Sequence, residues 1–482
     1  MRMRRAASLV CIAALLVSCG GDGGTNVASA TGGSGTPTPT PTPTPPTGAS
    51  CSLAARQDWA LSQLREWYLF PDLLDEGVDP GAYGSLQAYV DALVAPARAA
   101  GRDRNFTHVT SIKEENEYYN SGETAGFGFV VELTVAGEIV LSDVFEGSPA
   151  YQAGFRRGVR ILEIGDGGGG MVSVDRLLER GGYAAVLDAF GAAVPGVQRE
   201  FRYERPNGAN GVVTIAKAEF EILPVSPDFG VEILTAEDGS RFGYVHLRTF
   251  IETARTPLTQ AFQQFRTEGV DRVALDLRDN GGGLVDVASL MGDLMGRDRS
   301  GDVFSRVTYR PSKSSYNETH RFTPLVQSVA LDRLAIIGTR STASASELVA
   351  NAFPPFLGQD AALVGENTYG KPVGQIALDR AECDDRLRVI AFRTANAVGN
   401  SNYYNGLADS MPVFCPQSED IFAPLGSTDE PMIAEAGRFL AGGEAACTGI
   451  AGATAKTAQG VPAPALIPTY PSAAQREMPG FF

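Results

Sequence analysis

The sequence predicts a multidomain α+β protein with a helical N-terminal subdomain, a β-rich domain and an α/β core. Apolar side chains recur at helical spacing in residues 51–121, and short strand-like runs separated by glycine turns fill residues 122–222. Residues 223–447 alternate strands with helices. The 482 residues are 44% hydrophobic and 20% charged, which is enough to bury a core in two or three domains. A single small module and a wholly disordered chain are therefore excluded.

The charge balance argues against one class of partner. The formal net charge is −16, and an acidic surface repels phosphate, so we expect no nucleic-acid binding. The chain contains five lysines among its 40 basic residues. Because lysine, unlike arginine, can lose its proton near neutrality, a lysine in a glycine-rich loop invites a chemical explanation. Lys371 is such a residue.

The N-terminal residues have the features of an export signal. Residues 1–19 combine three arginines with a 13-residue apolar stretch, which is too short to span a bilayer. They end in Leu-Val-Ser-Cys, which resembles a bacterial lipobox in which Cys19 would be lipidated. The alternative is an ordinary signal peptide with a chance cysteine. Residues 20–50, rich in Gly, Thr and Pro, predict an extended linker. We therefore expect a lipid-anchored protein of the bacterial cell envelope, facing the periplasm, with the outer membrane as the first expectation.

Four further cysteines suit an oxidising compartment. Cys51, Cys383, Cys415 and Cys447 allow up to two disulfides, with three possible pairings. Cys383 and Cys415 flank one apolar strand pattern, so we expect them to pair and Cys51 to pair with Cys447; buried free thiols are the alternative. Residues 448–482, rich in Ala, Pro and Gly, are expected to form a flexible tail.

The β-rich region carries a recognisable pattern. Strand-like runs precede Ser148-Pro149-Ala150, and an Ala-Gly turn and a Gly-Val-Arg-Ile-Leu strand follow. This order resembles a PDZ domain, with Val159 where that family usually has Asp. The peptide-binding loop would then consist of Gly126, Phe127, Gly128 and Phe129. Successive backbone N–H groups in such a loop can hold a terminal carboxylate, and the ligand adds as a β-strand.

Familiar catalytic patterns are missing from the core. The sequence contains no H-E-x-x-H, C-x-x-C, P-loop, G-x-S-x-G or S-x-x-K pattern, so we expect no metal and no cofactor. The three histidines, His108, His246 and His320, lie in helical, strand-like and polar contexts. None of them is a good candidate for the histidine of a Ser-His-Asp triad.

A serine-rich turn is the strongest candidate for a nucleophile. Residues 341–347 read Ser-Thr-Ala-Ser-Ala-Ser-Glu and lie between a predicted strand and an apolar helical run. A serine at a helix start lies where backbone N–H groups point outward and favour negative charge. A simple N-cap is the alternative interpretation of such a serine.

A lysine follows at a suitable distance. Lys371 comes 25 residues after Ser346, beyond one predicted helix and one strand, which can return it to the serine turn. Neighbouring Tyr369, Pro372 and Val373 would desolvate its amine and lower its pKa, so that it could take the serine proton. Gln375 could hold that amine in line. A surface lysine in a glycine turn is the alternative.

A third segment, residues 275–284, runs from a strand into three glycines and then a helix, which suits binding of an oxyanion. Together, the Thr-Ala-Ser-Ala-Ser-Glu, Gly-Lys…Gln and Asp-Leu-Arg-x-Asn-x-Gly-Gly patterns resemble the carboxyl-terminal-processing, or tail-specific, serine proteases. The resemblance covers about residues 55–435 and implies a PDZ-like domain and a ClpP/crotonase-like α/β protease core.

The resemblance also implies roles for individual residues. Ser346 would be the nucleophile, Lys371 the general base and Gln375 its orienting partner. The backbone N–H groups of Gly282 and Glu347 would form the oxyanion hole. Two positions depart from the family pattern: Gly281 replaces the usual proline, and Pro372 replaces the usual glycine.

The sequence therefore predicts a serine endopeptidase that hydrolyses peptide bonds by a Ser-Lys mechanism. Its partners would be polypeptide substrates with free C-termini, captured by the PDZ-like domain. A non-catalytic lipoprotein that binds peptides or apolar ligands is the alternative, since the interphotoreceptor retinoid-binding repeats belong to the same family.

Overall fold

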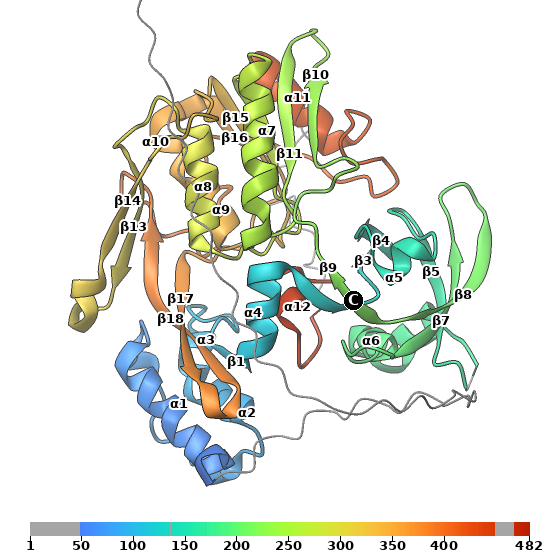
Figure 1. Ribbon diagram of the computed structural model, residues 1–482, viewed down its shortest axis with the longest axis vertical. Coiled ribbons are helices and arrows are strands. Elements are labelled where there is room, and N and C mark those ends of the chain that lie inside the picture. Colours follow the sequence, from blue (N-terminus) through green and yellow to red (C-terminus); the bar gives the residue numbers. More distant parts are fainter. Residues whose placement is uncertain (1–48, 135, 169, 449–466) are drawn as a thin grey trace, which may run out of the picture. The chain divides into compact units, whose positions relative to one another are not determined.

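The computed structural model describes residues 49–134, 136–168, 170–448 and 467–482 (Figure 1). The predicted signal sequence, Cys19 and nearly all of the predicted linker lie outside the described residues, so those expectations stay predictions. Within the described part, no helix combines the length and apolar character needed to cross a membrane. The predicted α+β multidomain class is confirmed: the described residues form several separate sheets, with helices packed against them.

The N-terminal subdomain is helical, as predicted. Its helices begin at side-chain caps: Ser52, Ser85 and Ser111 each accept a hydrogen bond from a backbone N–H in the first turn of the helix that follows. The apolar faces pack on strand β18 of the core. The elements are α1 (Leu53–Trp67), α2 (Leu86–Leu93), α3 (Ala95–Ala99), β1 (His108–Ser111) and α4 (Ile112–Ser121).

The β-rich domain is a six-stranded antiparallel sheet closed by one long helix. Its main order is β3-β4-β5-β7-β8, with β6 on β5, while β2 and β9 pair separately. The core is aromatic and includes Phe127, Phe129 and Phe201 from the sheet side and Phe190 from α6. The elements are β2 (Glu123–Gly126), β3 (Phe129–Leu133), β4 (Ile139–Val144), α5 (Pro149–Gln152), β5 (Arg160–Gly165), β6 (Val172–Ser173), α6 (Val174–Phe190), β7 (Gln198–Glu204), β8 (Asn210–Ala216) and β9 (Ala218–Glu221).

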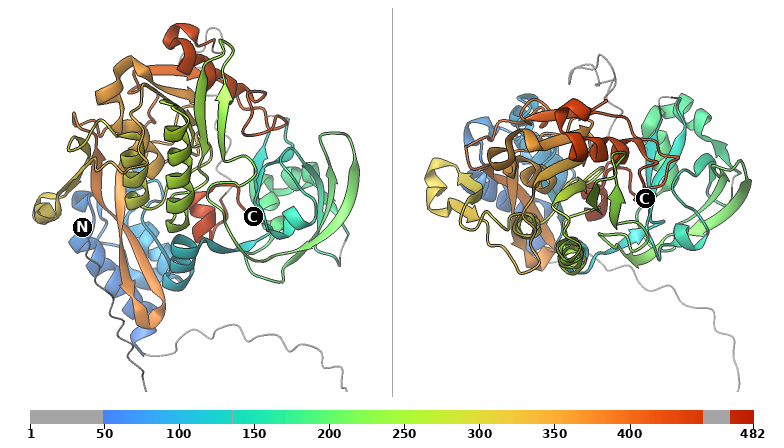
Figure 2. Two further views of the ribbon diagram at one scale, coloured as in Figure 1. Left: turned by 45° about the horizontal axis from the view of Figure 1, so that its top comes forward. Right: turned by 90° about the horizontal axis from the view of Figure 1, so that it is seen from above.

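The core domain is built on a sheet of order β10-β11-β12-β15-β16-β19, parallel except for the β10–β11 hairpin. Helices α7, α8 and α9 cover one face of this sheet and α11 covers the other (Figure 2). Successive residues of a strand point to opposite faces, so each strand contributes side chains to two apolar clusters, one under each set of helices. The elements are β10 (Val231–Thr235), β11 (Arg241–His246), α7 (Arg255–Thr267), β12 (Arg272–Asp276), α8 (Val285–Met295), β15 (Arg333–Gly338), α9 (Ala345–Ala352), α10 (Pro354–Leu357), β16 (Ala361–Gly365), β19 (Val413–Pro416) and α11 (Pro431–Gly442).

A second sheet joins the core to the N-terminal subdomain. It has the order β1-β18-β13-β14, with β17 paired to β18. The long β17–β18 hairpin packs on the N-terminal helices, and Gln375 lies near the start of β17. The strands are β13 (Val303–Tyr309), β14 (Glu318–Arg321), β17 (Val373–Arg380) and β18 (Asp385–Ala395).

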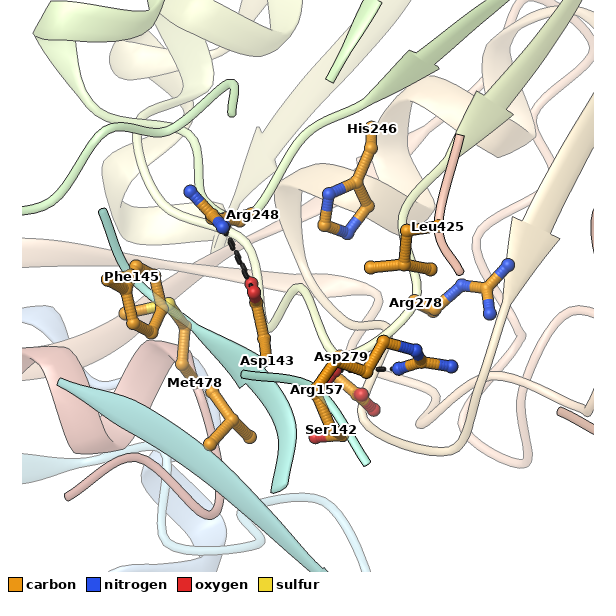
Figure 3. Close-up of a pocket in the computed structure, with 11 residues that line it drawn as sticks. Ser142, Asp143, Phe145, Arg157, His246, Arg248, Arg278, Asp279, Leu425 and Met478 are labelled. Atoms are coloured by element: carbon orange, nitrogen blue, oxygen red, sulfur yellow. Dashed lines mark hydrogen bonds and ion pairs between the residues drawn. The ribbon is translucent and has the colours of Figure 1, made fainter. Parts of the chain in front are cut away.

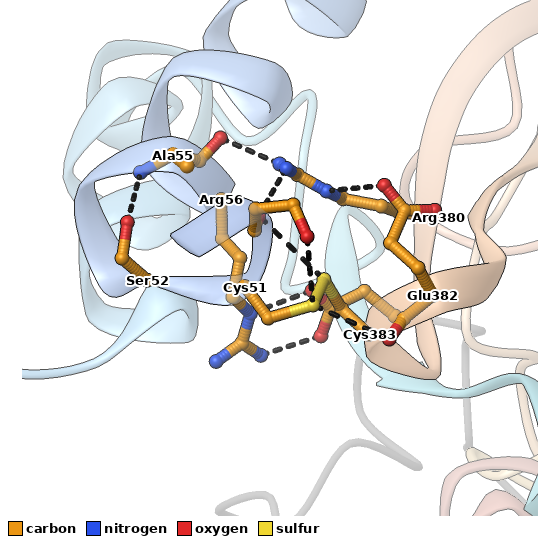
Figure 4. Close-up of a disulfide and its surroundings, with 9 residues drawn as sticks. Cys51, Ser52, Ala55, Arg56, Arg380, Glu382 and Cys383 are labelled. Carbon is orange, nitrogen blue, oxygen red and sulfur yellow. Dashed lines mark hydrogen bonds and ion pairs between the residues drawn. A yellow bond between two sulfur atoms is a disulfide. The ribbon is translucent and has the colours of Figure 1, made fainter. Parts of the chain in front are cut away.

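All four cysteines of the folded body form disulfides, but the expected pairing is wrong. Cys51 pairs with Cys383 (Figure 4), and Cys415 pairs with Cys447. Cys383 lies at the turn of the β17–β18 hairpin, whereas Cys415 lies in β19 of the other sheet. The apolar strand between these two cysteines therefore leads from one sheet to the other, and the two thiols do not meet.

The expectation of a flexible tail is also wrong for its last part. Residues 467–482, which we call the C-terminal segment, contain a short helix, α12 (Ala473–Glu477), capped by Ser472. Met478, Phe481 and Phe482 are buried. Figure 1 shows α12 beside α4, and the end of the chain beside β3 and β9. The apolar residues that follow α12 anchor this segment on the folded body.

Candidate active site

The serine-rich turn places Ser344, rather than Ser346, at the start of a helix. Strand β15 ends at Gly338 and α9 begins at Ala345, so Ser344 is the N-cap. Its backbone has φ 55° and ψ −112°, a conformation that non-glycine residues rarely adopt. Such strain persists only where the surroundings fix it, and it is concentrated at functional sites. The side chain of Ser344 is partly exposed.

Ser346, the serine predicted to be the nucleophile, lies in a different environment from Ser344. It belongs to the first turn of α9 and is fully buried. Its hydroxyl donates a hydrogen bond of 3.0 Å to the carbonyl of Asn280. The predicted helix began after Ser346, but the helix begins one residue before it, which turns the Ser346 hydroxyl inward.

The carboxylate of Glu347 joins the serine turn to the lysine loop. It accepts hydrogen bonds from the backbone N–H groups of Ser344 (3.1 Å) and Lys371 (2.7 Å) on the same oxygen. The other oxygen accepts from the Thr368 hydroxyl and the Gly370 N–H. Burial raises the pKa of Glu347, and these four donors oppose that rise. Because one oxygen of Glu347 accepts hydrogen bonds from both backbone N–H groups, the backbones of Ser344 and Lys371 lie close together. This link through Glu347 was not predicted from the sequence.

Lys371 and Gln375 contact one another as predicted. The Lys371 ammonium donates to the Gln375 side-chain oxygen at 3.0 Å and lies 5.0 Å from the centre of the Phe106 ring. The Gln375 amide donates in turn to the Phe106 carbonyl. Burial lowers the pKa of Lys371 below its usual 10.5, while the carboxylate of Glu477 in α12 opposes this shift. A lysine so placed can become a neutral amine.

The glycine loop after β12 lies against the serine turn. A Cβ on Gly282 would lie 2.7 Å from the Ser344 Cβ, so only glycine permits this approach. The Gly282 N–H donates to the side chain of Asn280 at 2.9 Å, and the Glu347 N–H donates to the Ser344 side chain. Both predicted oxyanion donors are therefore occupied within the protein. The Ala345 N–H has no acceptor among the described residues.

A buried ionic network supports this loop from below. Arg278 contacts the carboxylates of Asp276, Glu419 and Glu430 at 2.8–2.9 Å, and its side chain is 2% exposed. These ion pairs fix the side chain of Arg278, and with it the start of the glycine loop that follows.

A pocket lies between the core and the β-rich domain (Figure 3). Arg248 of the core binds Asp143 of β4 at 2.6 Å across it, and lowers the pKa of Asp143 although burial alone would raise it. Asp279, next to the glycine loop, also lines the pocket, and burial raises its pKa to about 7. Met478 of the C-terminal segment forms part of the wall. The pocket thus connects the glycine loop with β3 and β4.

The predicted peptide-binding loop lies at the edge of the β-rich domain. The rings of Phe127 and Phe129 are buried in the domain core, so these residues could present only their backbone to a ligand. The N–H groups of Gly128 and Phe129 both point to one oxygen of Phe482. The edge of β3 is therefore already paired with another segment of this chain.

Residues 241–406 match peptidase family S41. This part of the chain is therefore an S41 peptidase domain, a class that the alternating α/β core and the serine, lysine and glycine loops had led us to expect.

Curated relatives carry the names of carboxyl-terminal-processing enzymes. The chain is 28% identical over 300 residues to the chloroplastic carboxyl-terminal-processing peptidase 3 of Arabidopsis thaliana, covering 60% of this chain and 52% of the relative. It is 27% identical over 261 residues to the carboxyl-terminal-processing protease of a Picosynechococcus strain, covering 52% and 55%. The chain thus spans about half the length of these relatives.

A solved structure shares the fold. A protein from Bacteroides fragilis assigned to the S41 proteases superimposes with a TM-score of 0.60 and 23% identity, covering 80% of this chain and 97% of that one.

Proposed function

We propose that the chain is a serine endopeptidase of the carboxyl-terminal-processing type, with Ser344 as nucleophile and Lys371 as general base. The observation that supports this assignment best is the strained Ser344 backbone, bound to Lys371 through one oxygen of Glu347. A residue in this conformation at the N-terminus of α9 presents its hydroxyl where the helix favours developing negative charge.

The proposed reaction needs no group beyond these side chains and water. The neutral amine of Lys371 takes the proton of the Ser344 hydroxyl as its oxygen attacks the peptide carbonyl. The same proton then passes to the departing amine, and an acyl-enzyme remains. Water, deprotonated by Lys371, hydrolyses the ester and restores Ser344. Gln375 holds the amine during both steps, and we assign the N–H of Ala345, the first residue of α9, as the donor to the developing oxyanion.

The β-rich domain would bind the polypeptide substrate. The edge of β3, which residues 480–482 of this chain occupy, and the Gly126–Phe129 loop suit a PDZ-like capture of a polypeptide C-terminus by strand addition. The N-terminal sequence supports anchoring of the enzyme in the bacterial envelope through Cys19.

The test compares two serines that are two residues apart. We expect Ser344→Ala to reduce hydrolysis of unfolded casein at least a thousand-fold and to abolish labelling by a serine-reactive fluorophosphonate. Ser346→Ala should keep at least a tenth of the activity and all of the labelling, because it removes one buried hydrogen bond worth about 1 kcal/mol. Loss of labelling in Ser346→Ala with full activity in Ser344→Ala would refute the assignment.

A further inference from the structure

The C-terminal segment adds a strand to the β-rich domain. Phe481 pairs with Val130 in an antiparallel bridge, and the Phe482 N–H donates to the Phe129 carbonyl at 2.9 Å. The Val131 N–H donates to the Gly480 carbonyl at 2.8 Å. Residues 480–482 thus satisfy the edge of β3 as the strand of a bound peptide would.

The loop before β3 holds the other end of this strand. The N–H groups of Gly128 and Phe129 donate to one oxygen of Phe482 at 2.8 and 3.3 Å. Gly128 has φ +83°, and a Cβ on Gly126 would lie 3.0 Å from the Phe482 carbonyl carbon, so both positions favour glycine. Two N–H groups that converge on one oxygen suit a carboxylate better than a mid-chain carbonyl.

The two phenylalanine rings point to opposite sides of the added strand. The Phe482 ring enters the aromatic core of the domain and stacks on Phe190 of α6 at 4.5 Å. The Phe481 ring packs beside Phe145 and Phe220, in the cluster that joins the domain to α4. The inward pocket therefore accepts an aromatic ring at the last position of a bound strand.

The same segment also reaches the glycine loop of the active site. The Gly281 N–H donates to the Glu477 carbonyl at 2.7 Å, one residue before the glycine that touches Ser344. The Glu477 carboxylate accepts from the Tyr119 hydroxyl at 2.6 Å. It also opposes the fall in the pKa of Lys371, which favours the protonated amine that cannot act as a base.

Gly281 is the position where the sequence departs from the proline usual in related proteases. Proline has no N–H and could not form this bond. A Cβ at this position would also lie 2.4 Å from the Glu477 carbonyl oxygen. The departure is thus explained by the contact with the C-terminal segment.

We propose that residues 473–482 compete in cis with the substrate, and that the groove along β3 selects polypeptides that end in phenylalanine. Such a polypeptide replaces Gly480–Phe482 on β3, and its binding frees the Gly281 loop from Glu477. Met478 lies in the wall of the pocket, between the residue that contacts Gly281 and the residues that pair with β3 (Figure 3). It therefore couples release of the segment from β3 to its release from the Gly281 loop. This inference rests on the proposed function for its meaning, but it concerns binding and is tested without catalysis.

The experiment measures binding to full-length protein carrying Ser344→Ala, so that no hydrolysis occurs. The probe is a fluorescently labelled peptide with the sequence of residues 473–482 and a free carboxylate. We expect a chain shortened to residues 1–472 to bind this probe at least ten-fold more tightly than the full chain, because a tethered competitor acts at an effective concentration on the order of millimolar. A probe with serine in place of the last phenylalanine, and an amidated probe, should each bind at least ten-fold more weakly to the shortened chain.

A point variant covers the case in which the shortened chain does not fold. Gly480 has φ +89°, and a Cβ there would lie 2.4 Å from the Val131 carbonyl oxygen, so Gly480→Ala should undock the segment and tighten probe binding several-fold. Gly208→Ala is the matched control, since Gly208 also has positive φ but faces open space. Probe affinity that is equal in the full chain, the folded shortened chain and Gly480→Ala would overturn the inference. Indifference to the last phenylalanine would overturn the selectivity.

The two proposals can fail separately. If casein is not hydrolysed but the probe binds as expected, the peptidase assignment fails and the competition stands. If the chain hydrolyses casein with Ser344 but removal of residues 473–482 changes neither probe affinity nor rate, the competition fails and the peptidase assignment stands.

Discussion

The turn that carries Ser344 and the edge of β3 each lie beside a glycine loop, but they satisfy their backbone groups in different ways. Around Ser344, the partners are buried side chains: Glu347 accepts hydrogen bonds from the serine turn and the lysine loop, and the Asn280 side chain accepts one from the glycine loop. Along β3, the partner is the backbone of residues 480–482, which lies far away in the sequence.

This difference separates a fixed site from an exchangeable one. Buried polar side chains that are fully hydrogen-bonded define one arrangement, because any other arrangement leaves a donor unsatisfied. Backbone strand pairing is indifferent to sequence, so another peptide can replace the resident strand at little cost, and only the side-chain pocket discriminates. The chemistry proposed for Ser344 requires the first kind of site, and the recognition proposed for β3 requires the second.

The largest expected effect removes the base from the fixed site. Lys371→Met should lower kcat/KM at least a thousand-fold without unfolding the protein, because the methionine replaces a partly buried stem of similar size. In the unaltered chain, activity should rise with pH through the pKa of Lys371, which burial places below 10.5, since only the neutral amine takes a proton. Both are measured with a fluorogenic peptide between pH 6 and 10.

A second variant makes the pH test specific. The Glu477 carboxylate raises the pKa of Lys371, so Glu477→Gln should move the midpoint of the pH profile to lower pH. Glu444→Gln, an exposed residue near the end of α11, is the control and should not move it. A midpoint unchanged by Glu477→Gln would contradict the assignment of the titration to Lys371.

A smaller effect is expected on the support of the fixed site. Arg278→Met leaves the buried carboxylates of Asp276 and Glu430 without their cation and removes one of the two arginines that bind Glu419, so it should lower the free energy of unfolding by about 3–5 kcal/mol. Arg202→Met in the β-rich domain removes an ion pair with Glu163 whose side chains are 46% and 32% exposed, and should cost less than about 1 kcal/mol. Chemical denaturation of both variants on a Ser344→Ala background measures this. Equal losses would show that the Arg278 network does not support the site.

The same contrast explains which parts of the fold could be predicted. Helices α1, α2 and α7 and strands β12, β15 and β16 were predictable, because their apolar periodicity is local. Helix α6 was not, since its backbone leaves the helical conformation at Gly181 and Gly182. The disulfide pairing depends on which sheet each strand joins, which is a non-local property.

The parts of the proposed site differ in how far the sequence alone predicts them. Lys371 and Gln375 followed from spacing and residue type, and their contact is present. Ser344 and Ser346 are chemically identical in the sequence, and the choice depends on where α9 begins, which the sequence leaves uncertain by a residue or two. The last residues were expected to be flexible because their composition is rich in Ala and Pro. Two phenylalanines at positions 481 and 482 were the signal that they would bind an apolar groove.

The smallest expected effect probes how firmly the exchangeable strand is tied to the core. Tyr119 donates its hydroxyl to Glu477 of the C-terminal segment, whereas its neighbour Tyr118 donates to, or accepts from, the hydroxyl of Thr249 in the core. Tyr119→Phe removes a hydrogen bond to a charged group, worth about 1.5–3 kcal/mol where it is fully formed. Part of that energy is recovered when water solvates the released carboxylate.

We therefore expect Tyr119→Phe to tighten binding of the phenylalanine-ended probe about five-fold, and Tyr118→Phe to leave it unchanged although it destabilises the fold by about 1 kcal/mol. The pair separates release of the segment from general loosening. Both variants delete one hydroxyl from α4, but only the Tyr119 hydroxyl is hydrogen-bonded to the C-terminal segment, whereas the Tyr118 hydroxyl is hydrogen-bonded to Thr249. Tighter probe binding in both variants would mean that the groove responds to stability alone, and that the bond to Glu477 plays no part in keeping β3 occupied.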